Sequence, residues 1–97
     1  MKNKLTENIE QFLRSYSAMV DYWDKEAGDT HQMLSIREYL AENERTLSIE
    51  ERAKMQAIDL EVLQLSEREN NMAGWDTQML HKTADVIRGI SSERKAA

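Results

Sequence analysis

Hydrophobic residues recur along most of this chain at the three- and four-residue steps that place side chains on one face of an α-helix. The pattern predicts four helices, over residues 6–27, 30–44, 48–71 and 75–89. With no Pro and three Gly among 97 residues, the chain has few of the turn signals that β-hairpins need. We therefore expect an all-α fold, a single domain over residues 1–97 built as a bundle of three to four mostly antiparallel helices. We expect the polar tail over 91–97 to fray.

The first predicted helix has a broad apolar face, in which Leu13 and Val20 flank a central stripe. The stripe consists of Leu5, Ile9, Phe12, Tyr16, Met19 and Trp23. Alternating steps of four and three residues are typical of an amphipathic helix that buries one side in a core.

Gly28, Asp29 and Thr30 predict a break between the first two helices. Gly adopts positive φ without steric cost, and either of the next two residues can cap the helix that follows. The hydrophobic spacing nevertheless continues through Met33 and Leu40. One kinked helix from residue 6 to residue 44 therefore remains an alternative to two separate helices.

The segment 48–71 is the clearest helix of the sequence. Ser48 followed by Glu51 matches a capping box, in which each side chain accepts a hydrogen bond from the backbone N–H of the other residue. The segment also carries two apolar stripes. One consists of Ile49, Ala53, Gln56, Leu60 and Leu63, and the other of Met55, Ile58, Val62 and Leu65.

A second apolar stripe requires a second partner, because a surface helix normally buries one face. That partner is either another helix of the same chain or another copy of the chain. We assign the stripe with Ile49 and Leu60 to the core. If the chain is a homo-oligomer, with a dimer as the expected form completing the bundle, the stripe from Met55 to Leu65 is the expected seam between copies. The predicted core is Ile9, Phe12, Tyr16, Met19, Trp23, Met33, Ile36, Leu40, Ile49, Leu60, Leu63, Met79 and Val86.

The net charge of −5 argues against nucleic-acid binding, because phosphate backbones attract basic proteins. No apolar run approaches the roughly 20 residues that cross a bilayer, so no membrane association is expected. The first ten residues contain no apolar segment of the kind found in signal peptides. Because the chain also has no Cys, we expect a cytoplasmic protein without disulfides.

Residues with catalytic or metal-binding chemistry are sparse. The only His residues are His31 and His81, too few for a metal site with three or four ligands. His81 and Asp85 lie one helical turn apart, which we interpret as a surface His beside a carboxylate. The sequence has no Gly-rich phosphate loop, no Ser nucleophile motif and no Cys nucleophile. We expect no enzyme activity, no metal and no cofactor.

Acidic and aromatic residues gather around the first predicted break. The cluster consists of Asp21, Tyr22, Trp23, Asp24, Glu26 and Asp29. The simpler interpretation is a solvated face with Trp23 in the core. The alternative is a contact patch for a basic partner, because aromatic side chains are enriched at protein interfaces.

Together these features favour a non-catalytic protein–protein interaction module: a small acidic helical adaptor, chaperone or inhibitor that acts by helix-on-helix packing on a protein partner. The first alternative is a structural helical oligomer whose assembly is its function. A helical bundle that binds a ligand or a metal is the second alternative. The residues predicted to bind a partner are Asp21, Tyr22, Asp24, Met55, Ile58, Val62 and Leu65.

Overall fold

The computed structural model describes residues 4–23, 30–70 and 74–96, and over these ranges it contains helices and no strands. Four α-helices pack against one another, which confirms the predicted all-α bundle. They are α1 (Lys4–Asp21), α2 (Thr30–Glu42), α3 (Ile49–Arg68) and α4 (Trp75–Ala96). A single 3-10 turn, η1 (Glu44–Thr46), joins α2 to α3.

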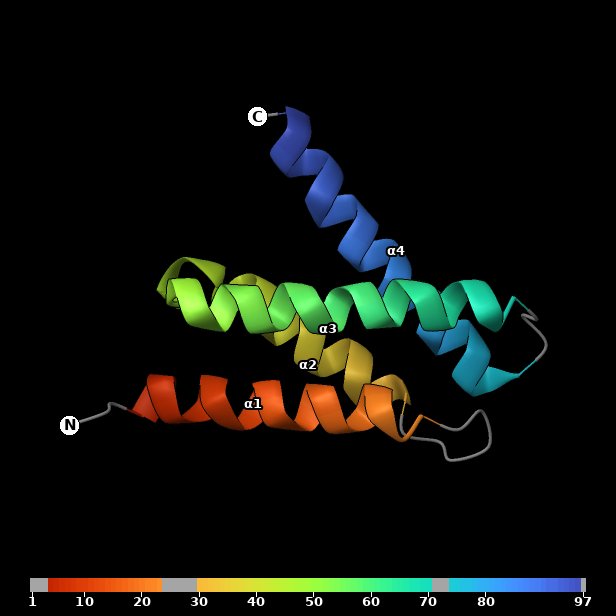
Figure 1. The fold of residues 1–97 in the computed structure, drawn as a ribbon, viewed down its shortest axis with the longest axis horizontal. Coiled ribbons are helices and arrows are strands. Elements are labelled where there is room, and N and C mark those ends of the chain that lie inside the picture. The colour runs from red at the N-terminus through yellow and green to blue at the C-terminus, as the bar shows by residue number, and fades with distance from the viewer. Residues whose placement is uncertain (1–3, 24–29, 71–73, 97) are drawn as a thin grey trace.

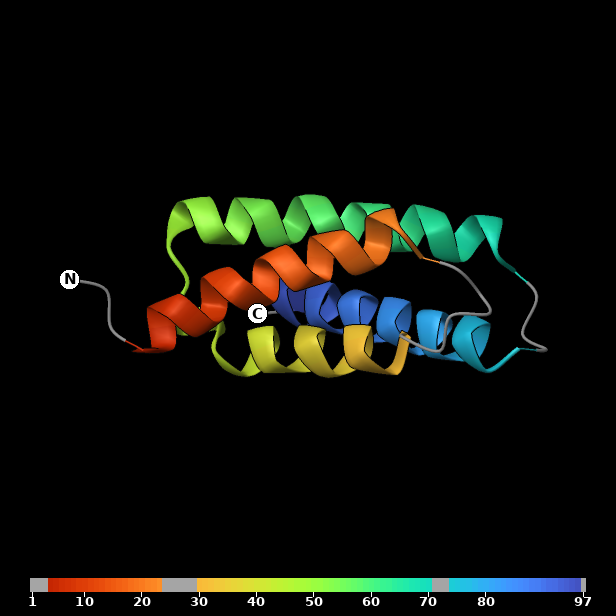
Figure 2. The same ribbon diagram turned by 90° about the horizontal axis from the view of Figure 1, so that it is seen from below.

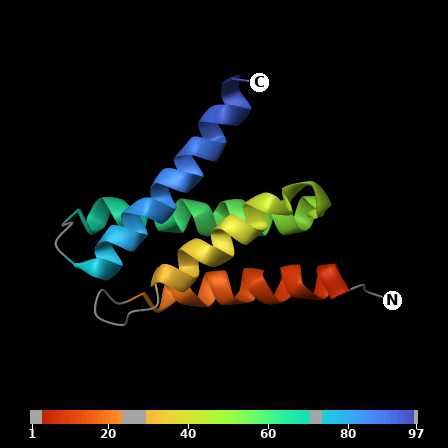
Figure 3. The ribbon, with the colours of Figure 1, turned by 180° about the vertical axis from the view of Figure 1, so that it is seen from behind.

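The helices form two layers that cross obliquely (Figure 1). α1 and α3 lie side by side in one layer and run in the same direction, while α2 and α4 form the other layer and run back (Figures 1 and 3). Consecutive helices are therefore antiparallel. Figure 2 shows α3 and α2 at opposite sides of the molecule. Most of the close packing is within each layer, between α1 and α2, and between α3 and α4.

α1 ends at Asp21 rather than at residue 27, and α2 runs back beside it, so the alternative of one kinked helix is wrong. A side-chain hydrogen bond joins the ends of the two helices: Trp23 Nε1 donates to the buried Thr30 Oγ1 at 2.8 Å. The chain has to leave the helix before Trp23 for this bond to form, which accounts for the early end of α1. Gly28 and Asp29, which predicted the break, lie outside the described residues.

The capping box at the start of α3 is confirmed. Ser48 Oγ accepts from the backbone N–H of Glu51 at 3.1 Å, and Glu51 Oε1 accepts from that of Ser48 at 2.7 Å. At the other ends, α2 stops at Glu42 and α3 at Arg68, slightly earlier than predicted.

α4 continues as a helix through residues 91–96, beyond its predicted end at residue 89. These residues include Glu, Arg, Lys and Ala, all strong helix formers, and no Pro interrupts them. The last turns of α4 project past α3 (Figures 1 and 3).

The core lies between the two layers. It consists of Ile9, Leu13, Tyr16, Val20, Met33, Ile36, Leu40, Leu47, Met55, Ile58, Val62, Leu80 and Ile87. Predicted core residues that the structure buries only in part are Phe12, Met19, Trp23, Leu63 and Val86. On α1 the buried face is thus centred closer to Leu13 and Val20 than the predicted stripe was.

α3 turns the opposite face to the core from the one predicted. Met55, Ile58 and Val62 are buried, whereas Ile49 is 87% and Leu60 is 61% exposed. The assignment of Ile49 and Leu60 to the core is therefore wrong. Met55 and Val62, which the sequence predicts at a seam between copies, are buried inside the single chain, and Ile58 keeps 8% of its surface exposed between α1 and α3.

Two polar residues explain this orientation. Asp59 and Ser66 lie on the same face of α3 as Val62, and both are buried. Asp59 finds its hydrogen-bond partners on α1 and α2, and Ser66 finds one on α4. Because these polar groups have hydrogen-bond partners, burying this face costs less desolvation free energy than the burial of its apolar side chains gains.

Candidate functional site

A buried polar triad joins three helices: Tyr16 of α1, Arg37 of α2 and Asp59 of α3. The Tyr16 hydroxyl donates to Asp59 Oδ1 at 2.6 Å. Arg37 donates from Nε to Oδ1 at 2.9 Å and from Nη2 to Oδ2 at 3.1 Å. Such a two-point pair between a guanidinium and a carboxylate is the geometry that best compensates buried charge.

Burial raises the pKa of Tyr16 far above its ordinary value, and the negative charge of Asp59 raises it further. Tyr16 therefore stays a neutral hydrogen-bond donor. Arg37 Nη1 is also buried, and within the described residues it has no hydrogen-bond acceptor. This nitrogen loses its hydration on folding, and no hydrogen bond compensates for that loss.

The triad faces protein on all sides that the structure describes. None of its three members lines either of the hollows described below. Across residues 4–23, 30–70 and 74–96, no three His, Asp or Glu side chains converge as metal ligands. We therefore assign the triad to the packing of α1, α2 and α3.

His81 fastens α4 to the C-terminal end of α3. Its Nε2 lies 2.6 Å from the carbonyl oxygen of Glu69, and its Nδ1 lies 2.9 Å from Ser66 Oγ. Because a carbonyl oxygen only accepts, Nε2 carries a hydrogen and donates it there. The prediction of a surface His beside Asp85 is wrong: His81 is half-buried, and Asp85 lies 3.4 Å from Arg88 instead.

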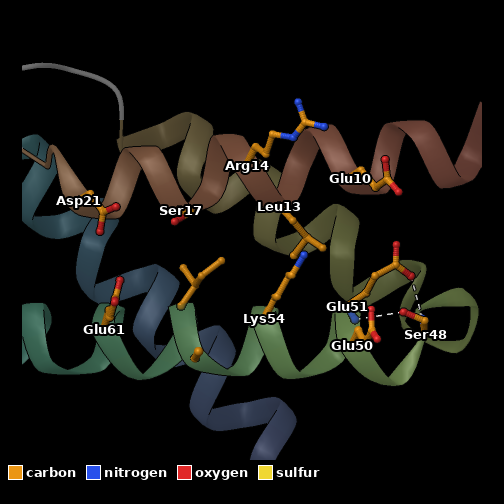
Figure 4. A pocket seen from close by; sticks show the side chains of 12 residues that line it. Glu10, Leu13, Arg14, Ser17, Asp21, Ser48, Glu50, Glu51, Lys54 and Glu61 are labelled. Atoms are coloured by element: carbon orange, nitrogen blue, oxygen red, sulfur yellow. Dashed lines mark hydrogen bonds between the residues drawn. The ribbon is translucent and has the colours of Figure 1, made fainter.

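A groove with a volume of about 840 Å³ runs along the seam between α1 and α3, on the side of that layer away from α2 and α4 (Figure 4). Leu13 of α1 and Ile58 of α3 line its floor and belong to the core beneath. Ser17 and Ala57 line its walls. The base of the groove is therefore apolar, although Leu13 keeps only 6% and Ile58 only 8% of its surface exposed.

Charged side chains divide this groove into three zones (Figure 4). In order along the helices the zones are Glu10 with Glu50 and Glu51, then Lys54 with Arg14, whose guanidinium points away from α3, then Asp21 with Glu61. We call the outer two the acidic end zones and the central one the basic middle zone. Five carboxylates against two cations leave the groove negatively charged.

A second hollow, of about 610 Å³, adjoins the groove at Asp21, which lines both. It is lined by Val20, Asp21, Tyr22, Trp23, Leu65, Arg68 and Glu69. Tyr22 is 85% exposed, whereas Trp23 is half-buried. The seam between α1 and α3 therefore ends beside an accessible aromatic ring.

The structure brings four of the seven predicted partner-binding residues to this seam. They are Asp21, Tyr22, Ile58 and Leu65. Met55 and Val62 lie below the surface in the core, where a partner cannot reach them. Asp24 lies outside the described residues.

The sequence prediction missed the charged walls of the groove. Its available signal was a pair of matching i,i+4 patterns, Glu10 with Arg14 on one helix and Glu50 with Lys54 on another. The match becomes meaningful only because α1 and α3 lie side by side in the same direction, which the sequence does not show.

A second exposed surface lies on the outer side of α3. From Ile49 to Gln64, six exposed residues without charge fall within about 100° of the helix circumference. They are Ile49, Ala53, Gln56, Ala57, Leu60 and Gln64. We call this surface the uncharged strip, and Ala57 lies where it meets the groove.

No protein-family model, no curated protein and no solved structure matches the chain. Among the described helices, none combines the length and the hydrophobicity needed to cross a membrane. Function is therefore argued from the geometry of the groove and of the strip.

Proposed function

We propose that this protein is a non-catalytic protein–protein interaction module that holds a helical segment of its partner in the groove between α1 and α3. The observation that carries the proposal is the make-up of the groove, with an apolar floor beneath charged walls. Protein interfaces have the same arrangement, in which a desolvated apolar centre is surrounded by a polar rim. Because Leu13 and Ile58 are already buried, the charged walls make most of the contact with the partner and select it.

The length of the groove suits a helix. Two parallel helices leave a furrow between them, and side chains of a third helix fill such a furrow by ridges-into-grooves packing. The lining residues extend from Ser48 to Glu61 on α3, which is about 20 Å of helix. A partner helix of three to four turns covers that length.

Site-specific photo-cross-linking in the native host tests the proposal. A photoreactive benzoyl-phenylalanine replaces Ser17, which lines the groove, and in a matched control it replaces the exposed Glu38 of α2, which does not. We expect a discrete adduct of fixed mass from Ser17 that is absent from Glu38. Identical adducts from both positions, or none from Ser17, would overturn the proposal.

The second candidate is a self-assembling structural oligomer, and the uncharged strip favours it. A helix face with exposed Ile49 and Leu60 gains apolar burial when another copy packs on it. Sedimentation equilibrium of the wild type and of Leu60→Glu tests this candidate. A wild-type dimer that becomes a folded monomer in Leu60→Glu supports it, and a wild type that stays monomeric at high concentration excludes it.

A further inference from the structure

The order of charges along the groove specifies the kind of partner that fits. We infer that the occupant is an amphipathic helix of a partner protein, with basic residues at both ends and an acidic residue between them. This inference rests on the proposed function. Each basic end meets an acidic end zone, and the central carboxylate meets the basic middle zone.

The spacing of the zones sets the spacing on the partner. Glu10 and Asp21 are eleven residues apart on α1, and Glu51 and Glu61 are ten residues apart on α3. Both intervals correspond to about 15–17 Å along a helix axis. The partner therefore carries its two basic positions ten to eleven residues apart. Because Lys54 is three residues from Glu51 and seven from Glu61, the acidic position lies three to four residues from one basic position.

Three of the charges that line the groove are available for this pairing. Within the described part of the chain, Asp21, Lys54 and Glu61 form no ion pair. All three are exposed. Facing carboxylates from two helices repel each other in the free protein, so a cation placed between Asp21 and Glu61 relieves that repulsion on binding.

The other residues along the seam favour the same kind of partner. The floor residues Leu13 and Ile58 require apolar side chains at helical spacing on the face of the partner that enters the groove. Beyond Asp21, the exposed Tyr22 ring lies where a basic end of the partner emerges. A Lys or Arg side chain gains a cation–π contact there.

The mixed charges of the groove also explain why a uniformly basic helix is not the expected occupant. A uniformly basic helix places a positive charge on Arg14 and Lys54, and like-charge juxtaposition in an interface disfavours that partner. The basic middle zone therefore acts against nonspecific cationic segments. Specificity comes from the order of charges.

Two synthetic peptides test this inference. The first is a blocked 16-residue helix with Lys at two positions eleven residues apart, Glu four residues from one of them so that all three lie on one side, and Leu and Ala along one face. The second has the same apolar face but exchanges Lys for Glu and Glu for Lys. Titration calorimetry against the full chain at low salt is expected to show at least tenfold tighter binding of the first peptide. Equal affinities for the two peptides would overturn the inference.

A pair of charge-reversed protein variants provides the matched control. Asp21→Lys with Glu61→Lys changes one acidic end zone, and Glu38→Lys with Glu67→Lys makes the same change of net charge at exposed positions outside the groove. We expect the first variant to lose at least tenfold in affinity for the Lys–Glu–Lys peptide and the second to lose less than threefold. Equal losses would show attraction to net charge alone and would contradict the inference.

The two proposals fail separately. An adduct from Ser17 in the host, combined with no preference between the two peptides, leaves the interaction module standing and overturns the assigned partner chemistry. Absence of the Ser17 adduct overturns the module itself, whatever the peptides do. Circular dichroism of each variant confirms that a lost affinity does not reflect a lost fold.

Discussion

At the scale of single residues, the Tyr16–Arg37–Asp59 triad concentrates the electrostatic cost of the fold in one place. Removing two charges from water costs several kcal/mol, which their mutual attraction repays only in good hydrogen-bonding geometry. The two-point contact of Arg37 with Asp59 supplies that geometry, and the Tyr16 hydroxyl adds a third donor. The sequence identifies none of the three as partners, because they lie 21 to 43 residues apart.

Arg37→Met is expected to lower the free energy of unfolding by about 3–5 kcal/mol, because it leaves the Asp59 carboxylate buried without its cation. The triple variant Tyr16→Phe, Arg37→Met, Asp59→Leu replaces all three polar groups and is expected to recover most of that loss. Urea denaturation measures both. An Arg37→Met protein as stable as the wild type would show that the triad does not stabilise the fold as described.

Tyr16 is also expected to make stability fall at high pH. The unfolded chain loses the Tyr16 proton above a pKa of about 10, while the raised pKa of the buried hydroxyl keeps it protonated in the folded state. The unfolded state then binds fewer protons, so the free energy of unfolding decreases as pH rises. Relative to Tyr16→Phe, the wild type is expected to lose about 1.4 kcal/mol between pH 9 and pH 11. Parallel curves for the two proteins in urea denaturation would contradict this.

At the scale of the helix, α3 shows what hydrophobic periodicity can and cannot predict. Its extent, its capping box and its two apolar stripes follow from local sequence. Local sequence does not show which stripe faces inward. Asp59 and Ser66 look like polar residues that separate the two stripes, and their partners on other helices become known only from the structure. The break after α1 depends in the same way on Trp23 meeting Thr30.

A matched pair of truncations on α3 tests its orientation. Met55→Ala is expected to cost about 2–5 kcal/mol, because Met55 is 1% exposed and its removal leaves a cavity. Leu60→Ala is expected to change the free energy of unfolding by less than about 0.5 kcal/mol, since Leu60 is 61% exposed. Equal costs at low protein concentration would mean that α3 is turned differently.

At the scale of the whole molecule, the groove exists because α1 and α3 lie side by side and run in the same direction (Figure 1). That arrangement brings Glu10, Arg14 and Asp21 opposite the charges of α3 in register. Helix count and the all-α class could be predicted from spacing alone. The pairing of two helices that are not consecutive could not, because it depends on the buried contacts of all four.

The measurement that tests the account most directly compares cross-linking from three positions in the same host. Ser17 reports on the groove, Leu60 on the uncharged strip and Glu38 on a surface outside both. The account predicts an adduct with another protein from Ser17, and none of that mass from Leu60 or Glu38. An adduct from Leu60 with no adduct from Ser17 would contradict it and would place the interaction on the outer side of α3.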